Sequence, residues 1–227
     1  MTERATLSVD GLVVGILGGT GDQGRGLARR FALAGHEVII GSRSPERAAA
    51  AALEIGHGVR GLANRDAAGQ ASVVIAAVPW EGHGDLLSWL ADELAGKIVV
   101  DCVNPLGFDQ RGAYALPVAE GGPAEGSAAQ QAAALLPGSR VVAAFHHVSA
   151  VLLLDPEVDT IDLDVMVLGD DREATDLVQA LAARIPGVRG IYAGRLRNCG
   201  QIEALTANLV SINRRYKAHA GLRVTDI

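Results

Sequence analysis

The stretch that decides the fold is VVGILGGTGDQG, residues 13–24, in which an apolar run ends in a group of glycines. A helical pattern follows, and a second apolar run then ends in Gly41-Ser42-Arg43. This order of strand, glycine loop, helix and strand is typical of a dinucleotide-binding βαβ unit. Gly19, Gly21 and Gly24 have the G-x-G-x-x-G spacing. We expect the first glycine to permit a tight turn, the second to admit a pyrophosphate and the third to let the helix pack closely.

The residues after the second strand indicate which dinucleotide binds. An NAD site usually has a carboxylate about 20 residues beyond the glycines, where it accepts a hydrogen bond from the ribose 2′-hydroxyl. Here Ser42 and Arg43 occupy that place, and Arg47 follows one helical turn later. A hydroxyl and two guanidinium groups can donate to a 2′-phosphate, which a carboxylate would repel. The sequence therefore favours NADP over NAD. Ser44-Pro45 predicts a helix start at the same place.

Composition indicates a cytoplasmic enzyme with small-molecule partners. The 227 residues are enough for a dinucleotide-binding domain and one small appendage. The net charge of −6 and the lack of a basic stripe argue against nucleic acid as a partner. The sequence has no apolar stretch long enough to span a membrane and no signal peptide. Cys102 and Cys199 match neither a disulfide framework nor a metal site, which is typical of a reducing compartment.

Apolar runs and helical patterns continue to alternate along the chain. Nearly continuous apolar strands separated by helices predict a Rossmann-type α/β fold, with a doubly wound parallel sheet. Further strands are predicted at residues 72–78, 98–103 and 141–145, and further helices at 63–71, 85–94 and 127–136. Ligands bind outside the carboxyl ends of such strands. This rule predicts one cleft, lined by residues 18–24, 42–43, 78–80, 104–106 and 146–150.

The pattern changes after residue 150, and we therefore predict two domains, an NADP-binding domain at 1–150 and a smaller C-terminal α+β or helical domain at 151–227. A long Gly- and Pro-rich loop is predicted at 114–126, a length typical of segments that cover a site or move. The chain ends in a helical pattern over 198–220. Its apolar stripe is compatible with a homodimer and with an internal core.

The sequence lacks the proton donors of familiar hydride-transfer enzymes. None of the three tyrosines is followed four residues later by lysine, as in short-chain reductases. The two lysines, Lys97 and Lys217, lie before a predicted strand and near the end of the last helix, and no metal-ligand spacing is present. Because reduction of a carbonyl or imine generally needs a proton donor, this favours a redox cofactor as the partner. The protein would then act by positioning, without a catalytic side chain or a metal.

Several motifs together resemble the family of NADPH-dependent F420 reductases (F420H2:NADP oxidoreductases). They are LGGTGDQG at 17–24, GHEVIIGSRS at 35–44 and VPWE at 78–81, followed in the same order by VVDCVNP at 99–105, FHH at 145–147 and GDD at 169–171. The resemblance implies reversible, direct hydride transfer between NADP(H) and the deazaflavin coenzyme F420. Two other functions stay open from the residues alone, an NADPH-dependent reductase of an imine or ketone and a non-catalytic NADP sensor.

The resemblance also implies roles for individual residues. Those matching the 2′-phosphate site are Thr20, Ser42, Arg43 and Arg47, and those along the pyrophosphate loop are Thr20, Gly21, Asp22 and Gln23. Those matching the nicotinamide half are Trp80, Leu106 and Ala150, and those matching the deazaflavin pocket are His146 and Val148, with Leu222 closing it. His146 and His147 are predicted to occupy adjacent strand positions and so to face opposite ways.

Overall fold

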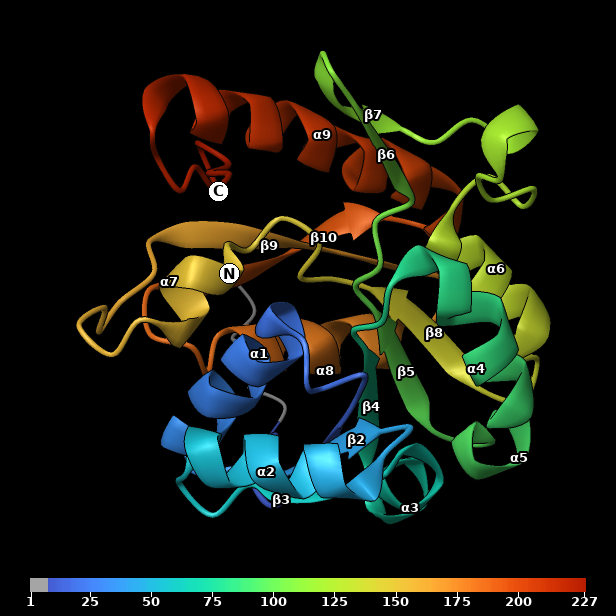
Figure 1. The fold of residues 1–227 in the computed structure, drawn as a ribbon, viewed down its shortest axis with the longest axis vertical. Helices are drawn as coiled ribbons and strands as arrows, with labels where there is room; N and C mark the ends of the chain where they lie inside the picture. Colours follow the sequence, from blue (N-terminus) through green and yellow to red (C-terminus); the bar gives the residue numbers. More distant parts are fainter. Residues whose placement is uncertain (1–7) are drawn as a thin grey trace.

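The computed structural model describes residues 8–227, which form one eight-stranded sheet covered by helices on both faces (Figure 1). The strands are β1 (Val13–Leu17), β2 (Glu37–Ser42), β3 (Arg60–Ala63), β4 (Val73–Ala76), β5 (Ile98–Asp101), β8 (Arg140–Ala143), β9 (Leu163–Gly169) and β10 (Val188–Gly194). Their spatial order is β10-β9-β8-β5-β4-β1-β2-β3. The first six in sequence, β1 to β5 and β8, are parallel and have the strand order of a Rossmann fold. The predicted fold class is confirmed.

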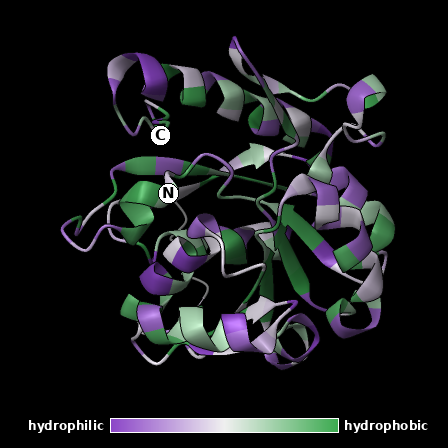
Figure 2. Ribbon diagram, viewed as in Figure 1, coloured by the Kyte–Doolittle hydropathy of each residue, from purple (hydrophilic) through white to green (hydrophobic). Residues whose placement is uncertain are grey.

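The buried apolar side chains form two cores, one on each face of the sheet, where helices pack against the strands. The helices are α1 (Asp22–Leu33), α2 (Pro45–Ile55), α3 (Asn64–Gln70), α4 (His83–Trp89), α5 (Ala91–Leu94), α6 (Ala128–Leu135), α7 (Ala150–Leu154), α8 (Arg172–Ala182) and α9 (Cys199–Tyr216). One core contains residues of α1, α2, α7 and α8, and the other residues of α3 to α6. Figure 2 shows apolar strands in the middle and polar residues along the outer helices. Such strands, buried on both faces, are typical of parallel sheets.

The C-terminal third extends the same sheet. β9 pairs antiparallel with β8, and β10 pairs parallel with β9. Beyond them, α9 packs against a separate hairpin made of β6 (Leu106–Asp109) and β7 (Gly112–Ala115) (Figure 1). The domain boundary at residue 150 stays a prediction, in a chain whose described residues share one large sheet. No helix among residues 8–227 has the length and apolar character needed to cross a membrane.

Several predicted elements differ from the structure. The loop predicted at 114–126 is wrong at its start, because Tyr114 and Ala115 belong to β7. The hairpin turns at Asp109, whose carboxylate accepts hydrogen bonds from the N–H groups of Arg111 and Gly112. The single helix predicted over 85–94 is two helices, α4 and α5, which meet at Leu90. The sequence pattern also gave no sign of β3 or α7. These elements are short, and tertiary contacts rather than periodicity define them.

Arg30 connects α1 to the segment that follows α7. Its side chain is buried, and its guanidinium donates hydrogen bonds to the backbone carbonyls of Leu152, Leu153, Asp155 and Val158. Burial lowers the pKa of Arg30. Since a guanidinium has five N–H donors and no acceptor, four carbonyl partners satisfy most of its hydrogen-bonding capacity. Arg30 thus fixes the chain that leads away from the cleft residues 146–150.

We predict that Arg30→Met destabilises the protein by about 3–5 kcal/mol, because it leaves buried carbonyls without donors. Urea unfolding at neutral pH measures the free energy of unfolding. Arg29→Met is the matched control on the same helix, since none of the hydrogen bonds among the described residues involves the Arg29 side chain, and it should change stability by less than about 0.5 kcal/mol. Equal losses in the two variants would contradict the role given to Arg30.

Candidate functional site

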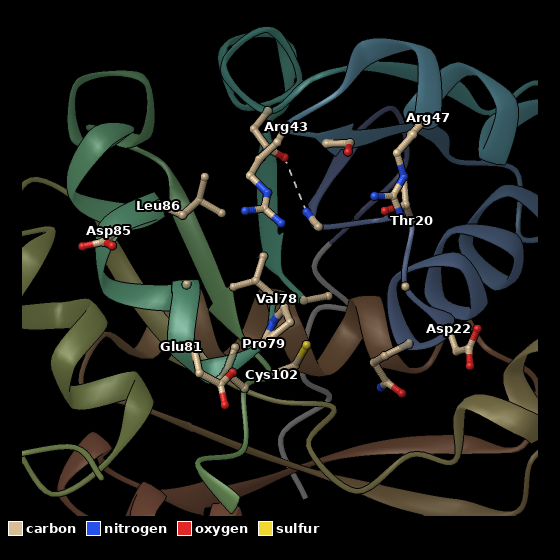
Figure 3. Close-up of a pocket in the computed structure, with 18 of the residues that line it drawn as sticks. Thr20, Asp22, Arg43, Arg47, Val78, Pro79, Glu81, Asp85, Leu86 and Cys102 are labelled. Atoms are coloured by element: carbon tan, nitrogen blue, oxygen red, sulfur yellow. Dashed lines mark hydrogen bonds between the residues drawn. The ribbon is translucent and has the colours of Figure 1, made fainter. Parts of the chain in front are cut away.

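A cavity of about 1320 Å³ opens at the carboxyl ends of the parallel strands (Figure 3). The glycine loop, the end of β2, the β4–α4 segment and the end of β5 form its wall. The lining residues are Gly18, Thr20–Gln23, Ser42–Ser44, Arg47, Asn64, Ala77–Pro79, Glu81, Gly82, Asp85, Leu86, Trp89, Cys102–Asn104 and His146. The structure therefore brings together, in one cleft, at least one residue from each segment that the sequence predicted to meet there.

The glycine loop packs too tightly for side chains. Gly18 has φ +68°, so the turn expected at Gly19 lies one residue earlier. A Cβ on Gly19 would lie 2.6 Å from the Cβ of Ile40 on β2, and one on Gly24 would lie 2.6 Å from the Cα of Gly19. By contrast, the nearest atom to a Cβ on Gly21 would be 3.8 Å away. Gly19 and Gly24 thus hold the loop and α1 against the sheet, while the cavity is open at Gly21.

The N-terminus of α1 is directed at this cavity. Its N-cap residue, Gly21, provides no side-chain acceptor for the first N–H groups of the helix. Free N–H groups and the positive end of the helix dipole together attract an anion. Gln23 ties the loop to the end of β8 by donating a hydrogen bond to the carbonyl of Phe145, at 3.2 Å. The carboxylate of Asp22 is directed away from the centre of the cavity (Figure 3).

Two arginines form a cationic wall at one end of the cavity. Arg43 and Arg47 are exposed, and neither forms an ion pair with a described residue. The Ser44 hydroxyl accepts a hydrogen bond from the N–H of Arg47, which confirms the predicted helix start. Ser42 also lines the cavity, and Figure 3 shows the Arg47 guanidinium near Thr20 and that of Arg43 between Thr20 and Leu86. Two unpaired cations beside hydroxyl groups are a ready site for a phosphate.

Opposite Arg43, α4 forms a wall of the cavity that none of the sequence motifs includes. Leu86 and Trp89 line the cavity, and the guanidinium of Arg65 lies 4.7 Å from the centre of the Trp89 ring. Trp89 is 54% exposed, although it is large and partly apolar. Asn64 was also missed, and its side-chain oxygen accepts from the Gly18 N–H at 3.4 Å. A tryptophan within the helix predicted at 85–94 was the available sequence signal for this wall. No sequence signal marked Asn64 as a cavity residue.

The other end of the cavity combines apolar side chains with Asn104, His146 and Glu81, the last of which Figure 3 shows near Pro79 and Cys102. Val78, Pro79 and Val103 contribute apolar surface there. His146 is 4% exposed, and neither of its ring nitrogens has a hydrogen-bond partner among the described residues. Burial lowers its pKa to about 4, so the ring is neutral at pH 7. A neutral imidazole has one donor and one acceptor, and on His146 both nitrogens are buried, with almost no accessible surface.

The predicted strand placement of the two histidines is wrong. β8 ends at Ala143, and Phe145 has φ +66°, so His146 and His147 lie in a turn rather than on a strand. A positive φ at a bulky residue is rare and breaks the strand geometry. His146 lines the cavity, whereas His147 is buried elsewhere and accepts a long hydrogen bond from the N–H of Met166, at 3.4 Å.

Among the described residues, besides Gly19 and Gly24, which pack inside the glycine loop, five of the predicted site residues are not part of the cavity wall: Trp80, Leu106, Val148, Ala150 and Leu222. Trp80 donates from its indole N–H to the carbonyl of Gly121, at 2.8 Å. Leu106 begins β6, Ala150 begins α7, and Val148 is buried in the core. Leu222 accepts at its backbone carbonyl from the N–H of Asp164, at 2.8 Å. Roles of these five in binding stay predictions.

Lys97 does not line the cavity and lies at the end of α3. Its ammonium donates to the carbonyls of Ala68, Gly69 and Ala71 at the end of α3. It therefore caps a helix C-terminus, where a cation is favourable. Residues 8–227 contain no cluster of three or more His, Cys, Asp or Glu side chains arranged to hold a metal ion.

Comparisons with known proteins identify relatives of this chain. Residues 13–105 match a protein family described as NADP oxidoreductase, coenzyme F420-dependent. The chain is 40% identical over 224 residues to the F420-dependent NADP reductase of Methanothermobacter thermautotrophicus, covering 94% of this chain and 95% of that protein. Identity to the reductase of the same name from Methanocaldococcus jannaschii is 39%, covering 94% and 98%.

Solved structures agree with these relatives. A putative F420-dependent NADP reductase from Arthrobacter sp. FB24 superposes with a TM-score of 0.79 at 27% identity, covering 95% of this chain and all of that one. An imine reductase from Streptomyces aurantiacus has a TM-score of 0.59 at 21% identity, which shows a shared fold alone.

We predict that the two buried histidines cause a loss of stability in acid. Burial lowers the pKa of His146 and of His147 to about 4, whereas an unfolded histidine titrates near 6.5. Their contribution is therefore complete above pH 6.5 and is lost as the pH falls towards 4. A shift of this size corresponds to about 3 kcal/mol per histidine over that range.

Urea unfolding of wild type and His147→Gln between pH 7 and pH 4 tests this. The variant should lose about 3 kcal/mol less than wild type over the range. His57→Gln is the control, because His57 is exposed, and its profile should parallel that of wild type. A His147→Gln profile parallel to wild type would refute the assignment.

Proposed function

The chain belongs to the family of coenzyme F420-dependent NADP oxidoreductases, and we propose that its cavity holds NADP(H) with the 2′-phosphate at Ser42, Arg43 and Arg47. The activity is reversible, direct hydride transfer between NADP(H) and coenzyme F420. The observation that carries the placement of NADP(H) is the pair of unpaired guanidinium groups beside the end of β2. No carboxylate occupies the position where an NAD site binds the 2′-hydroxyl.

The shape of the cavity suggests where the other parts of the dinucleotide lie. We propose that the pyrophosphate lies over Gly21 at the N-terminus of α1, where free N–H groups can donate to it. The adenine would lie between the Arg43 guanidinium and the wall made by Leu86 and Trp89. A guanidinium plane and an aromatic or apolar side chain are suitable surfaces on either side of a base. The nicotinamide then extends towards His146.

The reactive end of the cavity fits positioning better than acid–base catalysis. When bound, NADPH supplies a hydride from nicotinamide C4, and F420 accepts it at C5. Val78, Pro79 and Val103 exclude water from this end. His146 stays neutral at pH 7 and, with both ring nitrogens buried, adds no charge at this end. The chain would thus hold the two rings in the alignment that hydride transfer needs.

For F420 we propose the region adjoining His146, with contributions from Trp80, Leu106, Val148, Ala150 and Leu222. The C-terminal tail reaches this region, since Nδ1 of His219 lies 3.4 Å from the Ser149 hydroxyl. Asp164 secures the tail by accepting from the Arg189 and Arg223 side chains and from the Val224 N–H. These contacts hold the pKa of Asp164 well below its usual range. Residues 151–227 would in this way act as the domain that closes the F420 pocket.

We also propose a cytoplasmic homodimer. Ile212 and Tyr216 on α9 and Phe108 on the neighbouring hairpin are 39%, 73% and 71% exposed, and exposed apolar side chains that gather in one patch can mark a protein–protein interface. Cys102 and Cys199 are buried and unpaired, which suits a reducing compartment. Sedimentation equilibrium checks the dimer, and a monomer at micromolar concentration would count against it.

The function is tested by mixing purified protein, NADPH and oxidised F420. We expect the absorbance of oxidised F420 to fall, and to return when reduced F420 is given an excess of NADP⁺. Loss of NADPH with a cyclic imine or ketone, without any reaction of F420, would support the rival reductase instead. If no acceptor is turned over, the result would support a non-catalytic protein that only binds the dinucleotide.

We predict that Arg43→Ala raises the KM for NADPH about 10- to 100-fold, because one charge-assisted contact contributes roughly 1.5–3 kcal/mol. The KM for NADH should change by less than about threefold, since NADH lacks the 2′-phosphate. Arg60→Ala is the control, because Arg60 pairs with Glu37 at the amino ends of β3 and β2, whereas the cavity lies at the carboxyl ends of the strands. Equal rises in both KM values would place the phosphate elsewhere.

A further inference from the structure

Three buried titratable side chains lie behind the reactive end of the cavity, and none of them lines it. They are His83, Asp101 and Glu203, whose exposed fractions are 0%, 0% and 3%. They come from α4, β5 and α9, elements that are far apart in the sequence. Buried ionisable groups are costly unless they are well paired, so their arrangement calls for an explanation.

Asp101 is the last residue of β5, and it organises the segment that follows. One carboxylate oxygen lies 2.6 Å from Nε2 of His83, and the other accepts from the N–H of Val103, at 3.0 Å. Cys102, Val103 and Asn104 come next and form part of the cavity wall. The carboxylate of Asp101 therefore fixes the backbone of this wall from behind.

His83, the first residue of α4, extends the contact to two further elements. Its Nδ1 lies 2.9 Å from the side-chain oxygen of Gln131 on α6. The ring of Trp80 lies over it, with 5.5 Å between the ring centres. Although burial opposes protonation, the adjacent Asp101 carboxylate raises the pKa of His83. The pair holds α4, β5 and α6 in one fixed relation.

Glu203 connects the same network to α9. Its two carboxylate oxygens accept from the N–H groups of Ala128 and Ala129, at the start of α6. One helical turn later on α9, the Thr206 hydroxyl donates to the side-chain oxygen of Asn104, at 3.3 Å. The amide nitrogen of Asn104 donates to the carbonyl of His146, at 2.8 Å. Hydrogen bonds thus run from α9 through α6, α4 and β5 and back to α9.

This set of contacts includes Asn104 and His146, two polar residues that line the reactive end. A buried ion pair is weak evidence for stability, because apolar residues of similar volume often stabilise a core equally well. Replacing these groups by apolar ones would leave the core filled but would release the wall at residues 102–104. Their place beside the reactive end therefore points to orientation rather than to stability.

We propose that His83 and Asp101 are positioning residues for hydride transfer, which fix the Asn104–His146 wall, with Glu203 holding α9 in place. This inference rests on the proposed function. Neither residue lines the cavity in which we place the dinucleotide. Their contribution is to keep the wall within the small tolerance that ring-to-ring transfer allows, since a misplacement of about 1 Å can cost about 100-fold in rate.

The test compares Asp101→Ala with Asp101→Asn in the NADPH and F420 assay. Asp101→Ala removes both hydrogen bonds, and we expect kcat to fall 10- to 100-fold while the KM for NADPH stays within threefold. In Asp101→Asn the amide oxygen still accepts from Val103, and the amide nitrogen can donate to the other tautomer of His83. Its kcat should therefore stay within about threefold of wild type.

Leu94→Ala is the matched control, since Leu94 lies fully buried in the core on the same face of the sheet but outside this network. It should lower Tm at least as much as Asp101→Ala with kcat within twofold of wild type. Equal kcat values for Asp101→Ala and Leu94→Ala would overturn the proposal, as would an Asp101→Asn variant as slow as Asp101→Ala.

If Asp101→Ala does not fold, His83→Gln provides the second variant, because glutamine can donate to Asp101 but cannot also reach Gln131. The same fall in kcat without a change in the KM for NADPH is then expected, and an unchanged kcat would overturn the proposal. An inactive wild type would instead overturn the proposed function, so the two failures are distinguishable.

Discussion

The close packing of the glycine loop on β2 is the constraint on which the cleft depends. Gly19 lies directly against Ile40, and Gly24 lies directly against Gly19, with no space for a side chain at either contact. Any larger residue would move α1 away from the sheet. Because α1 is held there, its N-terminus and the Ser42-Arg43 segment open into the same cavity. The anion site of the helix and the cationic wall are thus fixed relative to each other.

The cavity is divided into two electrostatic regions. At one end, exposed arginines bring positive charge to a protein with a net charge of −6. At the other end, burial keeps His146 neutral, and apolar side chains surround it. Charge at the first end can bind and select a phosphate, while the second end can hold a nicotinamide without perturbing its charge. Binding and reaction are therefore separated along one cleft, which suits a reaction that needs alignment but no acid or base from the protein.

Local signals made the first half of the site predictable. The glycine spacing, the Ser42-Arg43 pair and the N-cap at Ser44 each act within a few residues, so the sequence contains their full description. Long-range contacts were not accessible in this way. The positive φ of Phe145 places both histidines in a turn, and Asp101 meets His83 only through the fold. The roles given to Trp80, Leu106 and Leu222 came from resemblance, and the cavity wall did not supply independent support for them.

The central claim is that Arg43 and Arg47 bind the 2′-phosphate, and calorimetric titration with two nucleotides tests it most directly. Adenosine 2′,5′-bisphosphate and adenosine 5′-monophosphate differ only in that phosphate. The account predicts that the bisphosphate binds at least about 100-fold more tightly at low salt, with the advantage falling as salt is added. Equal dissociation constants for the two nucleotides would contradict it.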